Sequence, residues 1–211
     1  MKIRLLLNRK GVTLIELVVG LIISGIVVAG VYRVFVAQSK AYTVQDQVVE
    51  VQQNIRSAME ILLRDLKMAG YDDDSLNSKI SIDNPISPAD HSITTNYEYD
   101  NTHRYEVEYR LDNGTLKRQL TIHPDAGLPS SITEDILENV EKLDFTYDVD
   151  TNDDGAVENW GVSAAGIDPS TIIAVLVTLQ ARPTPVNPDV VKMVMPRTLT
   201  TRVALRNLCL R

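Results

Sequence analysis

A single carboxylate, Glu16, lies near the start of a long apolar segment. It is the only charged residue between positions 12 and 32. A charged side chain inside a bilayer costs about 2.5 kcal/mol or more. A charged residue with this energetic cost is expected in an apolar segment only where it has a function. Glu16 is therefore the first candidate functional residue. Its chemistry would be an ion pair with a cation.

Residues 150–158 form a second group that could bind a ligand. The oxygen donors are Asp150, Asn152, Asp154, the backbone carbonyl of Ala156, and Glu158. With Gly155 at position 6, their spacing matches the first part of a calcium-binding loop. Gly161 stands where the bidentate glutamate of such a loop would be, and no helix pattern precedes it. Because the same residue types favour a plain turn, both a calcium site and a turn between strands remain open.

No pattern of catalytic residues is present. His91, His103 and His123 show no metal-ligand spacing, and no nucleotide-binding or nucleophile motif occurs. We therefore expect no enzymatic activity. Cys209 is the only cysteine, which excludes an intramolecular disulfide.

The apolar segment that carries Glu16 is long enough to span a membrane. Residues 12–32 would form a helix of about 32 Å. Four basic residues precede the segment and the next one is Arg33, which predicts that the N-terminus stays cytoplasmic and the remainder crosses. An ordinary signal peptide would need small residues just past the apolar core. We expect a retained membrane segment over residues 12–33.

Past Arg33 the apolar residues recur at intervals of three or four, which predicts an amphipathic continuation of the helix over residues 34–70. Its apolar positions are Val44, Val48, Val51, Ile55, Ala58, Leu62, Leu66 and Ala69. Gly70 is the expected C-terminal cap. The apolar stripe should cover a sheet.

Residues 71–211 are expected to form a globular head with an antiparallel sheet. We expect an irregular connection over 71–97 and then a hairpin closed by the turn Asn113-Gly114. The hairpin should pair Leu111 with Leu116, Tyr109 with Arg118, Val107 with Leu120 and Tyr105 with Ile122. Further strands are expected at 143–149, at 172–179 as a central strand covered on both faces, and within 190–195 and 199–208. The fold class is therefore α+β.

The run Gly11-Val12-Thr13-Leu14-Ile15-Glu16-Leu17, after a short basic leader, resembles the N-terminus of type IV pilins and pseudopilins. The resemblance implies the type IV pilin fold, and cleavage by a prepilin peptidase between Gly11 and Val12, which removes residues 1–11 as a leader. It also implies N-methylation of Val12 and a role for Glu16 in subunit assembly. Most of the family has phenylalanine where this chain has Val12.

Two shorter segments, residues 62–71 and 202–208, resemble PilW-like minor pilins. J-type pseudopilins of type II secretion share the general layout of a long N-terminal helix and a globular head. The resemblance implies a minor pilin precursor that takes part in assembly or priming of a type IV pilus, with the tip as one position. The alternatives are a type II secretion pseudopilin and a membrane-anchored adhesin or binding module.

The implied partners are prepilin peptidase, other minor and major pilins through the N-terminal helix, and an inner-membrane assembly platform. The implied location is the bacterial inner membrane, with one span and the head outside the cytoplasm, and then a pilus or pseudopilus. Loss of the leader would change the formal charge from −7 to −11, because it contains four basic residues and no acidic one. An acidic chain of this kind is not expected to bind nucleic acid.

Overall fold

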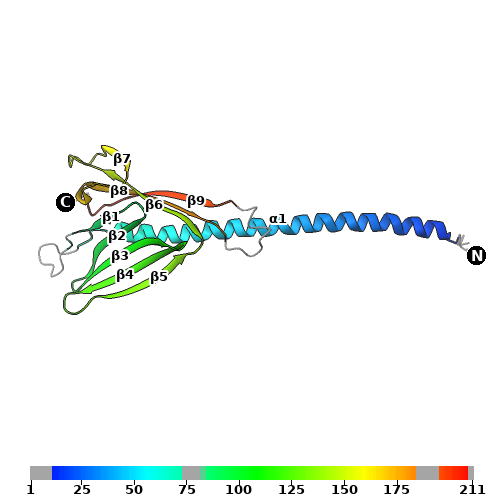
Figure 1. Cartoon of the computed structure of the whole chain (residues 1–211), viewed down its shortest axis with the longest axis horizontal. Coiled ribbons are helices and arrows are strands. Elements are labelled where there is room, and N and C mark those ends of the chain that lie inside the picture. The colour runs from blue at the N-terminus through cyan, green and yellow to red at the C-terminus, as the bar shows by residue number, and fades with distance from the viewer. Residues whose placement is uncertain (1–10, 73–81, 83, 184–194, 209–211) are drawn as a thin grey trace, which may run out of the picture. The chain divides into compact units, whose positions relative to one another are not determined.

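The computed structural model describes residues 11–72, 82, 84–183 and 195–208 (Figure 1). The chain consists of two compact units, Met1–Gln45 and Asp46–Arg211. A single long helix, α1 (Leu14–Met68), extends through the first unit and into the second. The second unit adds antiparallel strands in two sheets. The α+β layout of a pilin-like protein is therefore confirmed.

The limits of α1 follow from local chemistry at both ends. Thr13 and Glu16 bond to each other across the first turn, which caps the N-terminus. At the other end Gly70 has a φ of +73°, a left-handed conformation that glycine adopts at low cost. The N–H of Gly70 donates to the carbonyl of Asn96 over 2.8 Å. Gly70 is therefore the predicted cap, and it also ties the helix end to the sheet.

The first sheet is an antiparallel meander in the order β1-β2-β3-β4-β5. Its strands are β1 (Ile86–Pro88), β2 (Ser92–Asp100), β3 (His103–Asp112), β4 (Thr115–Pro124) and β5 (Ser130–Leu137). All four residue pairs predicted for the β3–β4 hairpin are observed. Asn113 and Gly114 have φ values of 49° and 79°, as a two-residue turn of this handedness requires.

The second sheet has the order β7-β6-β8-β9. Its strands are β6 (Val140–Val149), β7 (Asn159–Val162), β8 (Ile172–Ala181) and β9 (Arg197–Ala204). The predicted central position of β8 is confirmed. Its predicted burial on both faces is wrong, because buried residues such as Val175 and Val177 mostly alternate with half-buried ones such as Leu176. The apolar residues on the second face are only partly covered.

The strands that sequence patterns missed are polar. The expected irregular connection over 71–97 is wrong in its second half, because it contains β1 and most of β2. β2 reads Ser-Ile-Thr-Thr-Asn-Tyr-Glu-Tyr-Asp, a composition that resembles a loop although threonine and tyrosine suit strands. β5 and β7 were also not expected. Of the strand predicted within 190–195, all but Met195 lies outside the described residues.

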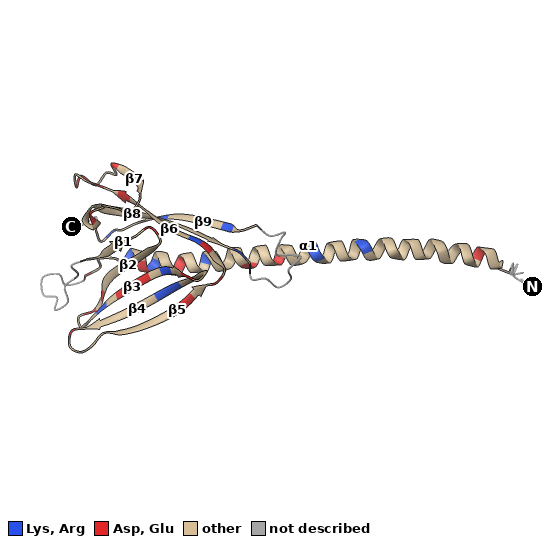
Figure 2. Ribbon diagram, viewed as in Figure 1, with Lys and Arg blue, Asp and Glu red and all other residues tan. Residues whose placement is uncertain are grey.

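One hydrophobic core joins α1 to both sheets within the second unit. Its buried residues include Val51, Ile55, Ala58, Leu62, Leu66 and Ala69 from α1, with Tyr109 and Leu116 from the first sheet and Phe145, Val175 and Val177 from the second. The predicted stripe on α1 is therefore its buried face, apart from the half-buried Val44 and Val48. Figure 2 shows that charged residues are sparse on the first half of α1 and frequent on the second.

Candidate functional site

The first half of α1 is an apolar helix surface whose side chains are exposed in the described part of the chain. Every residue from 12 to 35 is exposed, including Ile15 at 71% and Ile26 at 68%. Among the described helices, α1 is the one long and apolar enough to cross a membrane, judged by length and composition. A surface of this size requires lipid or other helices around it.

Glu16 and Thr13 form a reciprocal cap at the start of this helix. The Thr13 N–H and the Thr13 hydroxyl both donate to Glu16 Oε2 over 2.9 Å, and the Glu16 N–H donates to Thr13 Oγ1 over 3.3 Å. The spacing Thr-x-x-Glu is the capping-box pattern, which is visible in the sequence. The Glu16 carboxylate therefore has hydrogen-bond partners within its own chain, in addition to any cation that it pairs with.

The capping bonds leave the other oxygen of this carboxylate available. All the bonds that Glu16 accepts within the described residues end on Oε2. Oε1 can therefore accept from a group outside the chain, as a carboxylate has about four acceptor positions. The cap also holds the carboxylate beside the backbone of Thr13, which follows the predicted new N-terminus.

Gly11 and Val12, the residues of the predicted cleavage site, are both exposed and precede the first residue of α1. A Cβ atom placed on Gly11 would meet no heavy atom within 4 Å. Packing among the described residues therefore does not require a glycine at position 11.

The acidic loop brings three of the predicted ligands together. Asp150, Asp154 and Glu158 each place a carboxylate oxygen within 4.8 Å of the other two, and among the described residues they are the group of three or more that could hold a metal ion. The Asn152 side chain is bonded to Asp154 instead, through its amide group and its carbonyl oxygen. Among the described residues, His91, His103 and His123 do not form a second group that could hold a metal ion.

Backbone N–H groups already bind the central carboxylate of this loop. Asp150 accepts from Asp153 and Gly155 over 2.7 Å each and from Asn152 over 3.2 Å. Burial raises the pKa of Asp150, but the N–H donors, led by that of Gly155, outweigh it and leave the pKa below its ordinary value. These bonds are those of a tight turn, and they also keep the carboxylate charged and preformed for a cation.

The calcium site remains a prediction, with a direct test. An ion that binds only the folded head must raise its melting temperature. We expect the purified chain to melt several degrees higher in about 100 times the dissociation constant of calcium than in chelator. Asp154→Ala should remove the difference, whereas Asp168→Ala, outside the loop, should not. Identical melting curves with and without calcium would leave only the plain turn.

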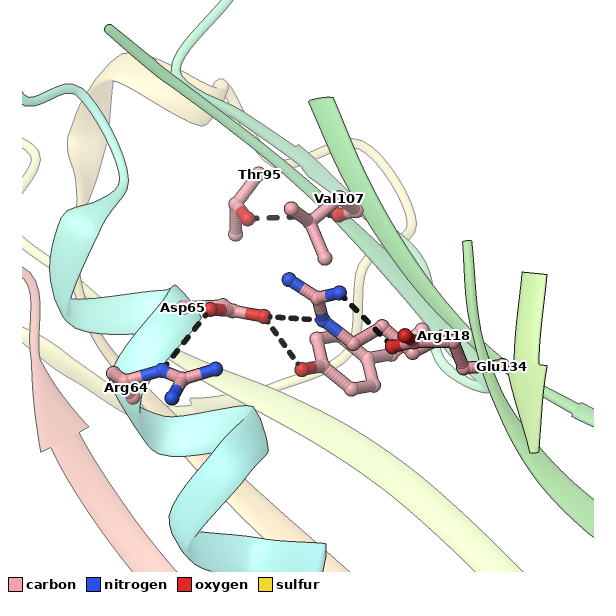
Figure 3. Close-up of polar contacts among 7 residues, drawn as sticks. Arg64, Asp65, Thr95, Val107, Arg118 and Glu134 are labelled. Atoms are coloured by element: carbon pink, nitrogen blue, oxygen red, sulfur yellow. Dashed lines mark hydrogen bonds and ion pairs between the residues drawn. The ribbon is translucent and has the colours of Figure 1, made fainter. Parts of the chain in front are cut away.

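A buried ion pair fixes the second half of α1 to the first sheet (Figure 3). Arg118 Nε from β4 donates to Asp65 Oδ2 over 2.7 Å, and the Tyr109 hydroxyl donates to the same oxygen over 2.7 Å. The Asp65 side chain is 3% exposed and that of Arg118 is 10% exposed. Arg118 Nη1 reaches Glu134 of β5 at 3.3 Å. This network positions the head on the helix.

Comparison with known proteins supports the class suggested by this geometry. Residues 6–32 match the family model described as the prokaryotic N-terminal methylation motif. A comparison with curated proteins finds no match. The motif and the exposed apolar helix support a type IV prepilin-like protein, a precursor of pilin or pseudopilin type. This class of protein is structural, is processed by a prepilin peptidase, associates with other pilins and fits an inner-membrane anchor.

Proposed function

We propose that the chain is the precursor of a minor pilin that takes part in assembly of a type IV pilus. The observation that carries the proposal is the combination of the methylation motif at residues 6–32 with an apolar helix surface that is exposed over residues 12–35. The resemblance of residues 62–71 and 202–208 to PilW-like minor pilins supports the minor class. A pseudopilin of type II secretion would share the methylation motif and the apolar helix, but not the resemblance to PilW-like minor pilins.

The apolar half of α1 would serve two environments in turn. In the inner membrane its exposed side chains contact lipid, and in a filament they contact the helices of neighbouring subunits. Transfer between the two buries no additional apolar surface from water, so packing and polar contacts must favour the filament. A charged group that gains a partner only in the filament provides such a contact.

Glu16 is that group, and cleavage creates its partner. A cut after Gly11 leaves the α-amino group of Val12 as a new cation. Pairing of this cation with Glu16 of a neighbouring subunit would offset the cost of a charge in an apolar setting. Because the two groups lie four residues apart along the sequence, the pair would also set the axial stagger between parallel helices. N-methylation of Val12 would keep the positive charge.

Processing provides the first test of the proposal. N-terminal sequencing of the membrane-extracted protein should give Val12 as the first residue in cells that contain a prepilin peptidase. Gly11→Val should block the cut, because the fold has room for a side chain at position 11 while a peptidase that selects glycine does not. Lys10→Gln is the matched control and should be cut. A chain that begins at Met1 in such cells, or near Tyr42, would refute the proposal.

A further inference from the structure

A basic groove lies between the second half of α1 and the edge strand β9. It consists of two hollows, the larger of about 640 Å³. Residues that line them come from α1 (including Gln52, Arg56, Leu63 and Lys67) and from the β9 region (including Arg197, Leu199, Arg202 and Arg206). We call this surface the α1–β9 groove.

The charge of the α1–β9 groove is opposite to that of the whole molecule. Five cations, Arg56, Lys67, Arg197, Arg202 and Arg206, line the two hollows, and no carboxylate does so among the described residues. Arg202 is committed elsewhere, since its Nε lies 3.0 Å from Asp148 Oδ2 and its guanidinium stacks on Trp160. The other four make no ion pair within the described part of the chain. A cluster of like charges without counterions favours an acidic partner.

The backbone of β9 offers a second attraction. Among the described residues, β9 pairs with β8 alone and is the last strand of its sheet. The other side of an edge strand presents N–H and C=O groups that can pair with another strand. An extended segment could therefore add to β9 and meet the cations of the groove with its side chains.

This molecule carries an edge strand of the required chemistry. β5 is the last strand of the first sheet, and its residues from Ser130 to Asp135 are all exposed. Its carboxylates Glu134 and Asp135 already face Arg118 at 3.3 Å and Lys117 at 3.6 Å. Glu138, which follows β5 directly, is exposed and makes no ion pair within the described residues, and no basic residue lies between 130 and 138. β5 and β9 are both eight residues long. Figure 2 shows the acidic residues on β5 and the basic ones on β9.

We propose that the α1–β9 groove binds the β5 edge of a second copy of this chain. The contact is heterologous, because it joins two different edges of the same molecule. Such a contact leaves one free edge at each end and generates an open, head-to-tail series. The inference goes beyond the proposed function, since it concerns contacts between the globular heads of two copies and does not depend on the apolar half of α1, on processing or on Glu16.

Cysteine cross-linking between two differently tagged copies tests the contact in membranes. Both copies carry Cys209→Ser. One also carries Thr133→Cys on β5, and the other Thr198→Cys or Thr200→Cys on β9. A disulfide requires Cα atoms about 4.4–6.8 Å apart, so at least one pairing should link the copies. Ser163→Cys, an exposed residue between β7 and β8, is the control and should not link to Thr133→Cys.

Charge reversal separates this contact from chance collisions. Arg56→Glu with Arg206→Glu should lower the yield of linked dimer by about threefold or more, since each reversal replaces attraction by repulsion. Glu138→Lys in the β5 copy should restore part of the yield with the reversed groove and lower it with the unmutated one. The proposal would be overturned if Thr133→Cys linked to the Ser163→Cys control as well as to the β9 cysteines, or if it linked to neither β9 cysteine. It would also be overturned if the charge-reversed groove gave as much linked dimer as the unmutated groove.

Discussion

Replacement of Asp65 by alanine is expected to lower the free energy of unfolding of the head by about 3–5 kcal/mol. Asp65 accepts from both Arg118 and the Tyr109 hydroxyl in the buried network of Figure 3. Its loss would leave the Arg118 charge buried without its main partner. Glu134 cannot replace Asp65, because it lies at 3.3 Å from the opposite end of the guanidinium and its side chain is 55% exposed.

Chemical denaturation of the detergent-solubilised chain measures this effect. Trp160 is the only tryptophan and lies on β7, so its fluorescence reports on the head. Glu60→Ala, on the exposed side of α1, is the control and should change stability by less than about 0.5 kcal/mol. The double variant Asp65→Leu/Arg118→Met should be much more stable than Asp65→Ala, because no buried charge remains. A loss for Asp65→Ala no larger than that for Glu60→Ala would show that the pair does not hold the helix.

The network also changes the titration of the tyrosines around it. Burial and the negative charge of Asp65 raise the pKa of Tyr97 to about 12. The same two causes raise the pKa of Tyr109 further, and its hydrogen bond to Asp65 adds to them. Both tyrosines are therefore neutral at neutral pH. The Tyr109 hydroxyl therefore keeps the proton that it donates to Asp65 at neutral pH.

Local patterns in the sequence were sufficient for α1 and the β3–β4 hairpin. Helical spacing from Val44 to Ala69 and the glycine at position 70 predicted the amphipathic half and its end. The Asn113-Gly114 turn fixed the register of the hairpin, because a shift by one residue would move its apolar side chains to the other face. These features depend on neighbours in the sequence, so one chain is enough to see them.

Contacts between distant segments could not be predicted in the same way. Arg118 was the one polar residue on the apolar face of the hairpin, and Asp65 falls on the buried side of α1. Each was a visible irregularity, yet they are separated by 53 positions in the sequence. Only the packing of α1 on the first sheet shows that they neutralise each other. The division into two sheets likewise depends on long-range pairing, such as that of β8 with β9.

At the candidate site, the sequence supplied the residues but not their local bonding. The motif around Gly11 and Glu16 could be recognised directly. The capping box of Thr13 and Glu16 was also visible as a pattern. Because Glu16 stands in an apolar segment, its charge was interpreted only as one half of an ion pair and not as a helix cap. In the acidic loop, spacing brought together Asp150, Asp154 and Glu158. It did not reveal how many of their oxygens the backbone would already use.

Replacement of Glu16 is expected to block assembly while processing and membrane insertion continue. Glu16→Ala keeps Gly11 and the apolar segment, which are the features that a peptidase and the membrane recognise. It removes the carboxylate that we pair with the Val12 α-amino group of a neighbouring subunit. Truncation of one partner of a buried charge pair costs about 2–5 kcal/mol, which corresponds to at least a tenfold loss of incorporation.

The capping box allows the ion pair to be separated from helix stability. Glu16→Gln keeps an acceptor for the bonds from Thr13 but has no charge, so it should assemble as poorly as Glu16→Ala. Thr13→Ala removes the capping hydroxyl and keeps the charge, so it should assemble nearly as well as the unmutated chain. The opposite order, with Thr13→Ala defective and Glu16→Gln normal, would assign Glu16 to the helix start alone.

The role of Glu16 in assembly is tested most directly by the amount of this chain in filaments sheared from the cell surface, compared at equal membrane levels for the unmutated chain and Glu16→Gln. We expect the processed chain, beginning at Val12, in the sheared fraction, and we expect Glu16→Gln to reduce its amount about tenfold or more. Absence of the unmutated chain from every filament preparation, or equal amounts of the two chains, would show that Glu16 does not join this chain to a filament.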